Sequence, residues 1–298
     1  MSVESEPLPW CAALARALHE PLPGTAPVSS RWVAVEHRGT WPTDILRHRD
    51  DAVRAFLVRA HTTGWRPVLV RRPGRRPTDG PTRVFLTDTT PPSPRTTVQR
   101  VTDPAVLADL PLPEPGETLP GTTVGEPMLL VCTHGRRDRC CAVDGRALAR
   151  TVAAIGGVDV WECTHLGGHR FAPTALVLPT GYVYGRLDGA AAVAAHKAAL
   201  AGEVEPALCR GRSTWSGRGQ VAELAVRDAT GLRDANVLRV LGSEPHGDAD
   251  VVRVAADDGR GWAVTVYATS CAARRPVSCG AAALPVTALH ATRVEQTA

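Results

Sequence analysis

Hydrophobic and polar positions at the start of the chain follow the periods of short strands and one helix. Residues 31–36 (RWVAVE) alternate between apolar and polar side chains, which is typical of a strand. Over residues 45–60 apolar side chains recur at helical spacing with charges between them, which predicts an amphipathic helix. Short apolar runs predict further strands at 67–70, 83–87 and 98–101. The order β-α-β-β favours a small α/β unit.

A second unit follows residues 111–127, which are rich in proline, glycine and glutamate and are typical of a linker or long loop. The pattern then predicts strands at 128–132, 158–163, 175–178 and 182–184, and helices at 147–155 and 189–200. The helix between the first two of these strands is a crossover of the kind that joins parallel strands. This unit is therefore also α/β.

The last part of the chain has an amphipathic helix pattern at 220–228 and strand patterns at 237–241, 250–255 and 262–267. The expected fold class is α/β with an α+β extension. The expected domains are an N-terminal α/β unit at 1–120, a second α/β unit at 125–205 and the extension at 206–298.

The composition is that of an ordinary globular protein, with 44% hydrophobic and 21% charged residues. The formal net charge of +4 does not by itself indicate a nucleic-acid partner. The chain has no run of 18 apolar residues, so we expect no membrane-spanning segment. The acidic N-terminus lacks the basic start and apolar centre of a signal peptide, so we expect a cytoplasmic protein.

The cysteines change this picture, because four of the eight fall between residues 132 and 163. In a cytosolic chain of this size such a concentration indicates metal or redox chemistry rather than a disulfide framework. We expect Cys11, Cys209 and Cys271 to be small buried apolar residues. No mechanism suggests a role for Cys279.

Two segments carry the chemistry, and each begins where a predicted strand ends: residues 132–141 (CTHGRRDRCC) and 162–171 (ECTHLGGHRF). Loops that leave the carboxyl ends of neighbouring strands lie side by side, so their side chains can share one site. Thiolate and imidazole together suit zinc or an iron–sulfur cluster. The candidate ligands are Cys132, His134, Cys140, Cys141, Cys163, His165 and His169.

Gly167 and Gly168 separate the last two histidines, and glycine lets the backbone turn sharply and approach a bulky group. Their N–H groups could bond cluster sulfurs, which is one influence on potential. Arg137 and Arg170, with the neighbouring arginines 136 and 139, could stabilise a reduced, more negative centre.

The pairing of C-T-H-G-R-R-D-x-C-C with H-L-G-G-H-R-F-A resembles the sucrase/ferredoxin-like family of thioredoxin-like [2Fe–2S] ferredoxins. The likeness spans most of the chain, with further matches at residues 22–26 (LPGTA), 210–212 (RGR) and 275–280 (RPVSCG). It implies a thioredoxin-like ferredoxin domain at 125–205. The preceding unit could be a degenerate relative of the same fold.

The resemblance also implies a [2Fe–2S] cluster held by Cys132, Cys141, His165 and His169, with Cys140 as the alternative to Cys141. A competing set uses two Cys-x-His pairs, as Rieske centres draw one Cys and one His from each of two loops. That set comprises Cys132, His134, Cys163 and His165.

Two thiolates leave such a cluster neutral when oxidised, so we expect a potential above that of plant-type ferredoxins, which lies at about −400 mV. The implied function is soluble one-electron transfer between redox proteins outside this chain, rather than enzymatic activity. The same ligands would also suit a zinc-stabilised binding module. Thiol–disulfide exchange usually needs Cys-x-x-Cys, whereas Cys140 and Cys141 are adjacent. No glycosidase pair of carboxylates is recognisable, so the sequence does not support sucrase activity.

Overall fold

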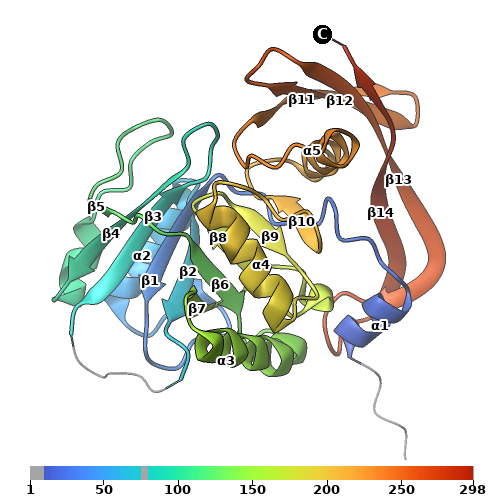
Figure 1. Cartoon of the computed structure of the whole chain (residues 1–298). Coiled ribbons are helices and arrows are strands. Elements are labelled where there is room, and N and C mark those ends of the chain that lie inside the picture. Colours follow the sequence, from blue (N-terminus) through green and yellow to red (C-terminus); the bar gives the residue numbers. More distant parts are fainter. Residues whose placement is uncertain (1–9, 75–79, 298) are drawn as a thin grey trace, which may run out of the picture.

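The structure is a computed structural model that describes residues 10–74 and 80–297. Within these residues the chain builds a large mixed sheet with helices packed on it and a smaller C-terminal sheet beside it (Figure 1). The helices are α1 (Cys11–Ala17), α2 (Asp51–Thr62), α3 (Arg146–Ile155), α4 (Gly189–Leu200) and α5 (Gly217–Thr230). Short 3-10 turns occur at η1 (Ile45–Arg47), η2 (Pro104–Asp109) and η4 (His169–Phe171), and η3 (Cys141–Gly145) is a π-helical turn.

The large sheet has the strand order β10-β9-β8-β6-β7-β2-β1-β3-β4-β5. Its strands are β1 (Arg31–Glu36), β2 (Arg66–Arg71), β3 (Thr82–Asp88), β4 (Arg95–Val101), β5 (Thr122–Thr123), β6 (Met128–Cys132), β7 (Asp159–Cys163), β8 (Ala175–Leu178), β9 (Tyr182–Tyr184) and β10 (Cys209–Arg212). The smaller sheet has the order β11-β12-β13-β14. Its strands are β11 (Leu238–His246), β12 (Ala249–Ala256), β13 (Gly261–Pro276) and β14 (Ala283–Gln296). The expected mixed α/β class is confirmed.

The two halves of the large sheet repeat one arrangement outward from their contact. In each half a helix joins two parallel strands, β1 with β2 and β6 with β7, and two antiparallel strands follow. The halves meet where β2 pairs antiparallel with β7, through Val70 opposite Cys163 and Arg71 opposite Glu162. Both predicted α/β units therefore contribute strands to one continuous sheet.

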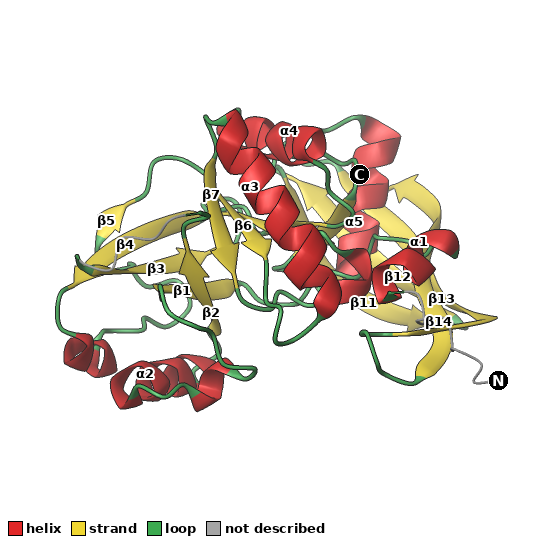
Figure 2. Cartoon of the chain, turned by 90° about the horizontal axis from the view of Figure 1, so that it is seen from below, coloured by secondary structure: helices red, strands yellow, loops and turns green. Residues whose placement is uncertain are grey.

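The core follows the alternation of the strands. In β6, Met128, Leu130 and Cys132 belong to one cluster of buried residues and Leu129 and Val131 to another. Strand β6 is thus buried on both faces, as its continuous apolar run predicts. Helices α3 and α4 cover the second cluster together, away from α2, which packs on β1–β3 (Figure 2).

One expected helix is shorter than its apolar pattern. Residues 45–47 form the turn η1, and α2 begins only at Asp51. The reason is a cap: the Asp50 carboxylate accepts hydrogen bonds from the N–H groups of Ala52 and Val53, both at 3.0 Å. Such a cap is worth about 1 kcal/mol and fixes the first turn of the helix.

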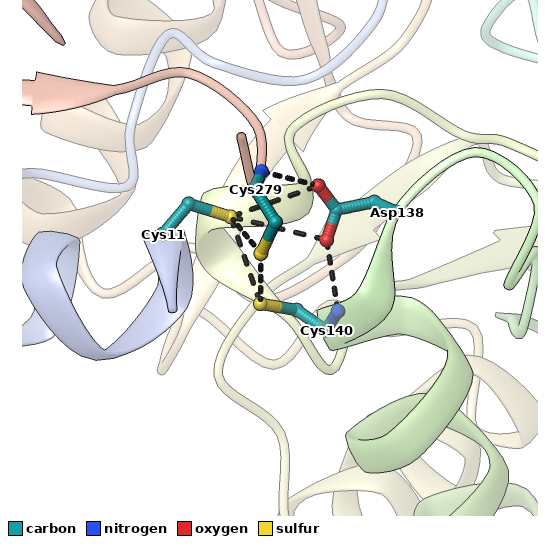
Figure 3. Close-up of side chains that lie close together, drawn as sticks. All are labelled: Cys11, Asp138, Cys140 and Cys279. Carbon is teal, nitrogen blue, oxygen red and sulfur yellow. Dashed lines mark hydrogen bonds between the residues drawn. The ribbon is translucent and has the colours of Figure 1, made fainter. Parts of the chain in front are cut away.

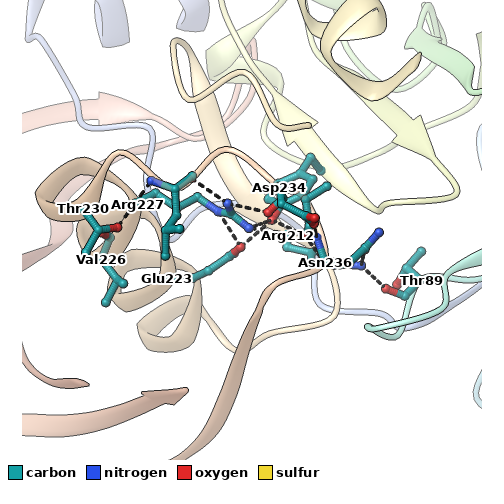
Figure 4. Close-up of polar contacts among 11 residues, drawn as sticks. Thr89, Arg212, Glu223, Val226, Arg227, Thr230, Asp234 and Asn236 are labelled. Atoms are coloured by element: carbon teal, nitrogen blue, oxygen red, sulfur yellow. Dashed lines mark hydrogen bonds and ion pairs between the residues drawn. The ribbon is translucent and has the colours of Figure 1, made fainter. Parts of the chain in front are cut away.

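The C-terminal sheet packs against α5, with a core that includes Val226, Val252 and Val264. A buried polar network then joins α5 to the large sheet (Figure 4). The Arg227 Nε atom donates to Glu223 at 3.0 Å, and its Nη2 atom donates to the Tyr182 hydroxyl on β9 at 2.8 Å. The two parts of the chain are therefore joined by charged and polar groups that water does not reach.

None of the helices in the described ranges is long and apolar enough to cross a membrane.

Replacing Arg227 with leucine should lower the free energy of unfolding by about 3–5 kcal/mol, because the Glu223 carboxylate would stay buried without its cation. Denaturant unfolding measures this change. The control is Arg233→Leu, which breaks an ion pair with Glu205 at 3.2 Å whose side chains are 42% and 25% exposed. This exposed pair should be worth about 0–1 kcal/mol. Equal losses in the two variants would contradict the buried network.

Candidate functional site

The two chemistry-bearing loops start side by side, as the sequence predicts. Cys132 and Cys163 end the parallel strands β6 and β7 and are paired in register. The loop after β7 is held by Thr164, whose N–H donates to the Leu69 carbonyl at 2.9 Å while its hydroxyl accepts from the Leu69 N–H at 2.9 Å. His165 therefore starts from a fixed position.

A glycine lets the turn that carries Cys141 approach β6. Any Cβ at Gly145 would collide with the carbonyl oxygen of Cys132. The π-helical turn η3 thus presses directly on the end of β6 and brings Cys141 next to Cys132.

The four residues that the resemblance implied gather in one place. The Cys141 Sγ atom lies 3.9 Å from Nδ1 of His169. The rings of His165 and His169 stack with centroids 4.1 Å apart and planes 17° apart. The Cys132 thiol hydrogen-bonds with Cys141 and His165. The structure thus brings two thiols and two imidazoles together, and their role as ligands remains a prediction.

The alternative ligands lie differently. The His134 ring forms a hydrogen bond through Nε2 with the Pro42 carbonyl at 2.9 Å. Its backbone N–H donates a hydrogen bond to Cys132. Cys163 is fully buried in the apolar cluster that contains Trp161 and Leu176. Cys140 belongs to a separate group, described below.

The surroundings favour the metal-binding protonation state at Cys132 and His169 but not at Cys141. The hydrogen bond from Cys141 is the main cause that lowers the pKa of Cys132 well below its ordinary value, and His165 and the His134 amide add to it against burial. The pKa of Cys141 is raised in turn, because its thiol donates that hydrogen bond and is buried. Burial lowers the pKa of His169 to about 4, so its ring is neutral at neutral pH. Thiolate and neutral imidazole are the forms that bind metals.

Arg210 is a residue of this site that sequence reasoning did not assign. Its fully buried guanidinium donates from Nη1 to the Gly167 carbonyl at 3.0 Å and from Nε to Thr25 at 3.0 Å. Burial lowers the pKa of Arg210 to about 9, whereas the nearby Cys132 and Cys141 raise it. The R-G-R motif at 210–212 was the available signal, but only the fold shows which loop Arg210 holds.

The structure shows what contacts the two glycines and two arginines expected at the cofactor make. Gly167 and Gly168 have φ of 90° and 73°, in the left-handed region that favours glycine, and Gly168 packs against the Arg210 guanidinium. Arg170 forms a 2.7 Å ion pair with Glu20, so another charge already balances it. Arg137 is exposed and shares with His165 the lining of a surface depression of about 320 Å³.

A second group of metal-binding side chains lies beside the first. The ligand atoms of Cys11, Asp138, Cys140 and Cys279 lie within 4.8 Å of one another and could hold a metal ion (Figure 3). The expectation that Cys11 is buried is confirmed, but its sulfur faces two other thiols rather than a purely apolar core. No local pattern links residues so far apart in the chain.

The protein thus combines a mixed α/β sheet, a Cys/His group at the strand ends, and a neighbouring group of three cysteines and one aspartate that could hold a metal ion. The chain matches the model of the sucrase/ferredoxin-like family over residues 22–211, and it belongs to that family. No curated protein and no solved structure matches it. The matched range contains all four implied ligands and Arg210, whereas Cys11 and Cys279 lie outside it.

Gly168→Ala should destabilise the protein more than Gly167→Ala, and differential scanning calorimetry can compare the two. Both positions have positive φ, so both substitutions carry a strain of about 1–3 kcal/mol. Only at residue 168 would the new Cβ also meet the Arg210 guanidinium, since the space beside Gly167 is open. Equal losses of stability in the two variants would show that the Arg210 guanidinium does not require a glycine at residue 168.

Glu20→Gln should destabilise the protein in a pH-dependent way. Burial raises the pKa of Glu20, but hydrogen bonds and charges from Arg275 and Arg170 outweigh it and bring the pKa below its usual value. Its contribution is therefore complete above the unfolded pKa of about 4.3 and is lost as the pH falls through the folded pKa. Unfolding measured from pH 7 down to acid should show the two proteins converging. A pH-independent difference between the two proteins would contradict this account.

Proposed function

We propose that the protein is a ferredoxin-like one-electron carrier whose [2Fe–2S] cluster is held by Cys132, Cys141, His165 and His169. The observation that carries this proposal is the convergence of two thiols and two imidazoles from two neighbouring loops, with Cys141 Sγ 3.9 Å from His169 Nδ1. Membership of the sucrase/ferredoxin-like family supports it. When bound, such a cluster accepts and returns one electron.

We also infer that residues 125–205 form a thioredoxin-like unit. The order β7-β6-β8-β9, with a helix joining the parallel pair and a helix after the hairpin, supports this inference. The first half of the sheet has the corresponding order β2-β1-β3-β4. That likeness supports a degenerate version of the same unit at the N-terminal side.

The donor set fits the proposed group. Thiolates with imidazoles on one side are the ligands of histidine-containing [2Fe–2S] centres. The low pKa of Cys132 and the neutral ring of His169 already favour the ligating forms. Cys141 would release its proton on binding, as metal ligands do.

The exposure of these residues indicates where an electron enters and leaves. Cys132 and Cys141 are fully buried, whereas His165 and His169 are half-buried. Electrons would therefore pass on the histidine side, next to the exposed Arg137 and its depression. A redox partner with an acidic surface fits this basic rim.

The carboxylates near the site are occupied in ways that disfavour a glycosidase. Glu162 forms a buried ion pair with Arg71 at 2.6 Å. Asp138 accepts the backbone N–H groups of Cys140 and Cys279 at 2.8 and 2.9 Å. Both carboxylates are buried, at 3% and 4% exposure, whereas glycoside hydrolysis needs two carboxylates that flank the substrate.

The first test is the visible spectrum of protein purified without oxygen, recorded before and after dithionite. A red-brown protein that reductant bleaches, with iron and sulfide in equal amounts, is the expected result. Cys132→Ala should remove the colour. Cys209→Ala should keep it, because the Cys209 side chain lies in the buried cluster with Leu129 and Val131 and not in the cluster that contains Cys132 and Cys141. The proposal would be overturned if the wild-type protein is colourless, binds zinc through these four residues and forms no cluster on reconstitution. That result would favour a zinc-stabilised module.

The histidines are tested in the same experiment through the potential. His169→Cys adds one negative charge to the ligand set and should lower the potential by on the order of 100 mV, judging from the gap between Rieske and all-cysteine centres. His134→Cys makes the same change where the ring faces Pro42, so its potential should change little. The reverse result would favour the two Cys-x-His pairs.

A further inference from the structure

Three cysteines and one aspartate converge from segments that are far apart in the sequence (Figure 3). Cys11 begins α1, and Asp138 lies in the loop after β6. Cys140 is the helical residue directly before η3, and Cys279 lies in the loop between β13 and β14. The three sulfur–sulfur distances are 3.6 Å for Cys11–Cys140, 3.4 Å for Cys140–Cys279 and 3.7 Å for Cys279–Cys11. The sulfurs thus form a nearly equilateral triangle.

The aspartate completes this triangle on one side. The two carboxylate oxygens of Asp138 lie 3.9 and 3.8 Å from the Cys11 sulfur. Ligands at zinc lie about 2.3 Å away for sulfur and about 2.0–2.2 Å for carboxylate oxygen. Tetrahedral angles at those lengths give edges of about 3.8 Å between sulfurs and about 3.6 Å between sulfur and oxygen. The observed separations are therefore close to those around a single tetrahedral ion.

The Asp138 carboxylate forms no ion pair within the described residues, although the charges of Arg170 and His169 act on Cys11 and Asp138 from nearby. Asp138 is only 4% exposed. Its oxygens accept the N–H groups of Cys140 and Cys279, which aims the carboxylate but supplies no net charge. A buried carboxylate is stable when it pairs with a cation or coordinates a metal.

We propose that Cys11, Cys140, Cys279 and Asp138 bind one structural zinc ion. Four protein ligands would leave no open position on the ion, which is typical of structural rather than catalytic zinc. Cys11, Cys140 and Asp138 are buried, and Cys279 is half-buried. All four ligand atoms lie within 4.8 Å of one another, so a single ion could reach them all. A disulfide between any two of these cysteines would require sulfurs about 2.05 Å apart and would leave the third thiol and the carboxylate without a partner.

The ion would join three segments that also share one small buried cluster, which includes Ala12 and Ala172. It would fasten α1 and the β13–β14 loop to the loop that leads into Cys141. Glu20, which follows α1, also links these segments through ion pairs with Arg170 in the turn η4 and Arg275 on β13. The zinc site therefore fixes Cys140 from one side while Cys141, the next residue, faces the four-residue Cys/His group on the other.

The test is metal analysis of the full-length protein after expression with zinc and removal of loosely bound metal. The wild type should hold one zinc ion per chain that Cys279→Ala loses, with at least about tenfold weaker zinc binding, which is the smallest effect usual for a lost partner of a metal site. Cys209→Ala, at a buried cysteine in β10, should retain the zinc. Cys132→Ala should also retain it, which separates this site from the proposed cluster.

X-ray absorption at the zinc edge of the wild-type protein provides a readout that needs no variant to fold. Three sulfur ligands at about 2.3 Å and one oxygen at about 2.0–2.2 Å are expected. A wild type without zinc, zinc bound to sulfur and imidazole nitrogen, or an intramolecular disulfide among Cys11, Cys140 and Cys279 in freshly purified protein would each overturn the assignment. A wild-type protein that binds this zinc ion but shows no iron–sulfur absorption would contradict the proposed function and still support the zinc site.

Discussion

The antiparallel contact between β2 and β7 is the constraint on which the rest of the molecule depends. It is short, with two residue pairs in register, but a buried ion pair between Arg71 and Glu162 and the double hydrogen bond of Thr164 with Leu69 extend it. The Arg71 guanidinium also lies over the Trp41 ring at 3.8 Å. This contact makes one sheet of two halves. It also fixes the start of the loop that carries His165, so the site inherits its geometry from the join.

Much of the sheet could be predicted because its strands are short apolar runs with clear ends. The strands β1, β6, β8 and β9 and the helix α4 have the bounds expected from the pattern. Strand β14 was not expected, since most of its side chains are exposed and its pairing is decided by β13. Strand β10 was not predicted either, because its CRGR sequence has no strand pattern. Its two arginines are buried, and each donates hydrogen bonds to backbone carbonyls of other segments.

In the site, too, the features with local sequence signals were predictable and those that depend on distant segments were not. The two loops were predictable because residue type and strand ends are local signals. Arg210 was not, because a buried arginine is identified by its partners, here the Gly167 carbonyl and Thr25, which come from other segments. The group around Cys11 was still harder to predict. Its members are separated by up to 268 positions and meet only after the C-terminal hairpin packs beside α1.

The adjacent cysteines explain how two sites can share one loop. Successive residues on a helical turn point about 100° apart, so Cys140 and Cys141 must face different surroundings. Cys140 faces Cys11 and Cys279, and Cys141 faces His169. A change that moves one thiol must therefore rotate the turn that carries the other. On this argument, the C-terminal extension and α1 hold the back of the loop whose front presents the Cys/His group, and their contribution to the site is rigidity rather than ligands.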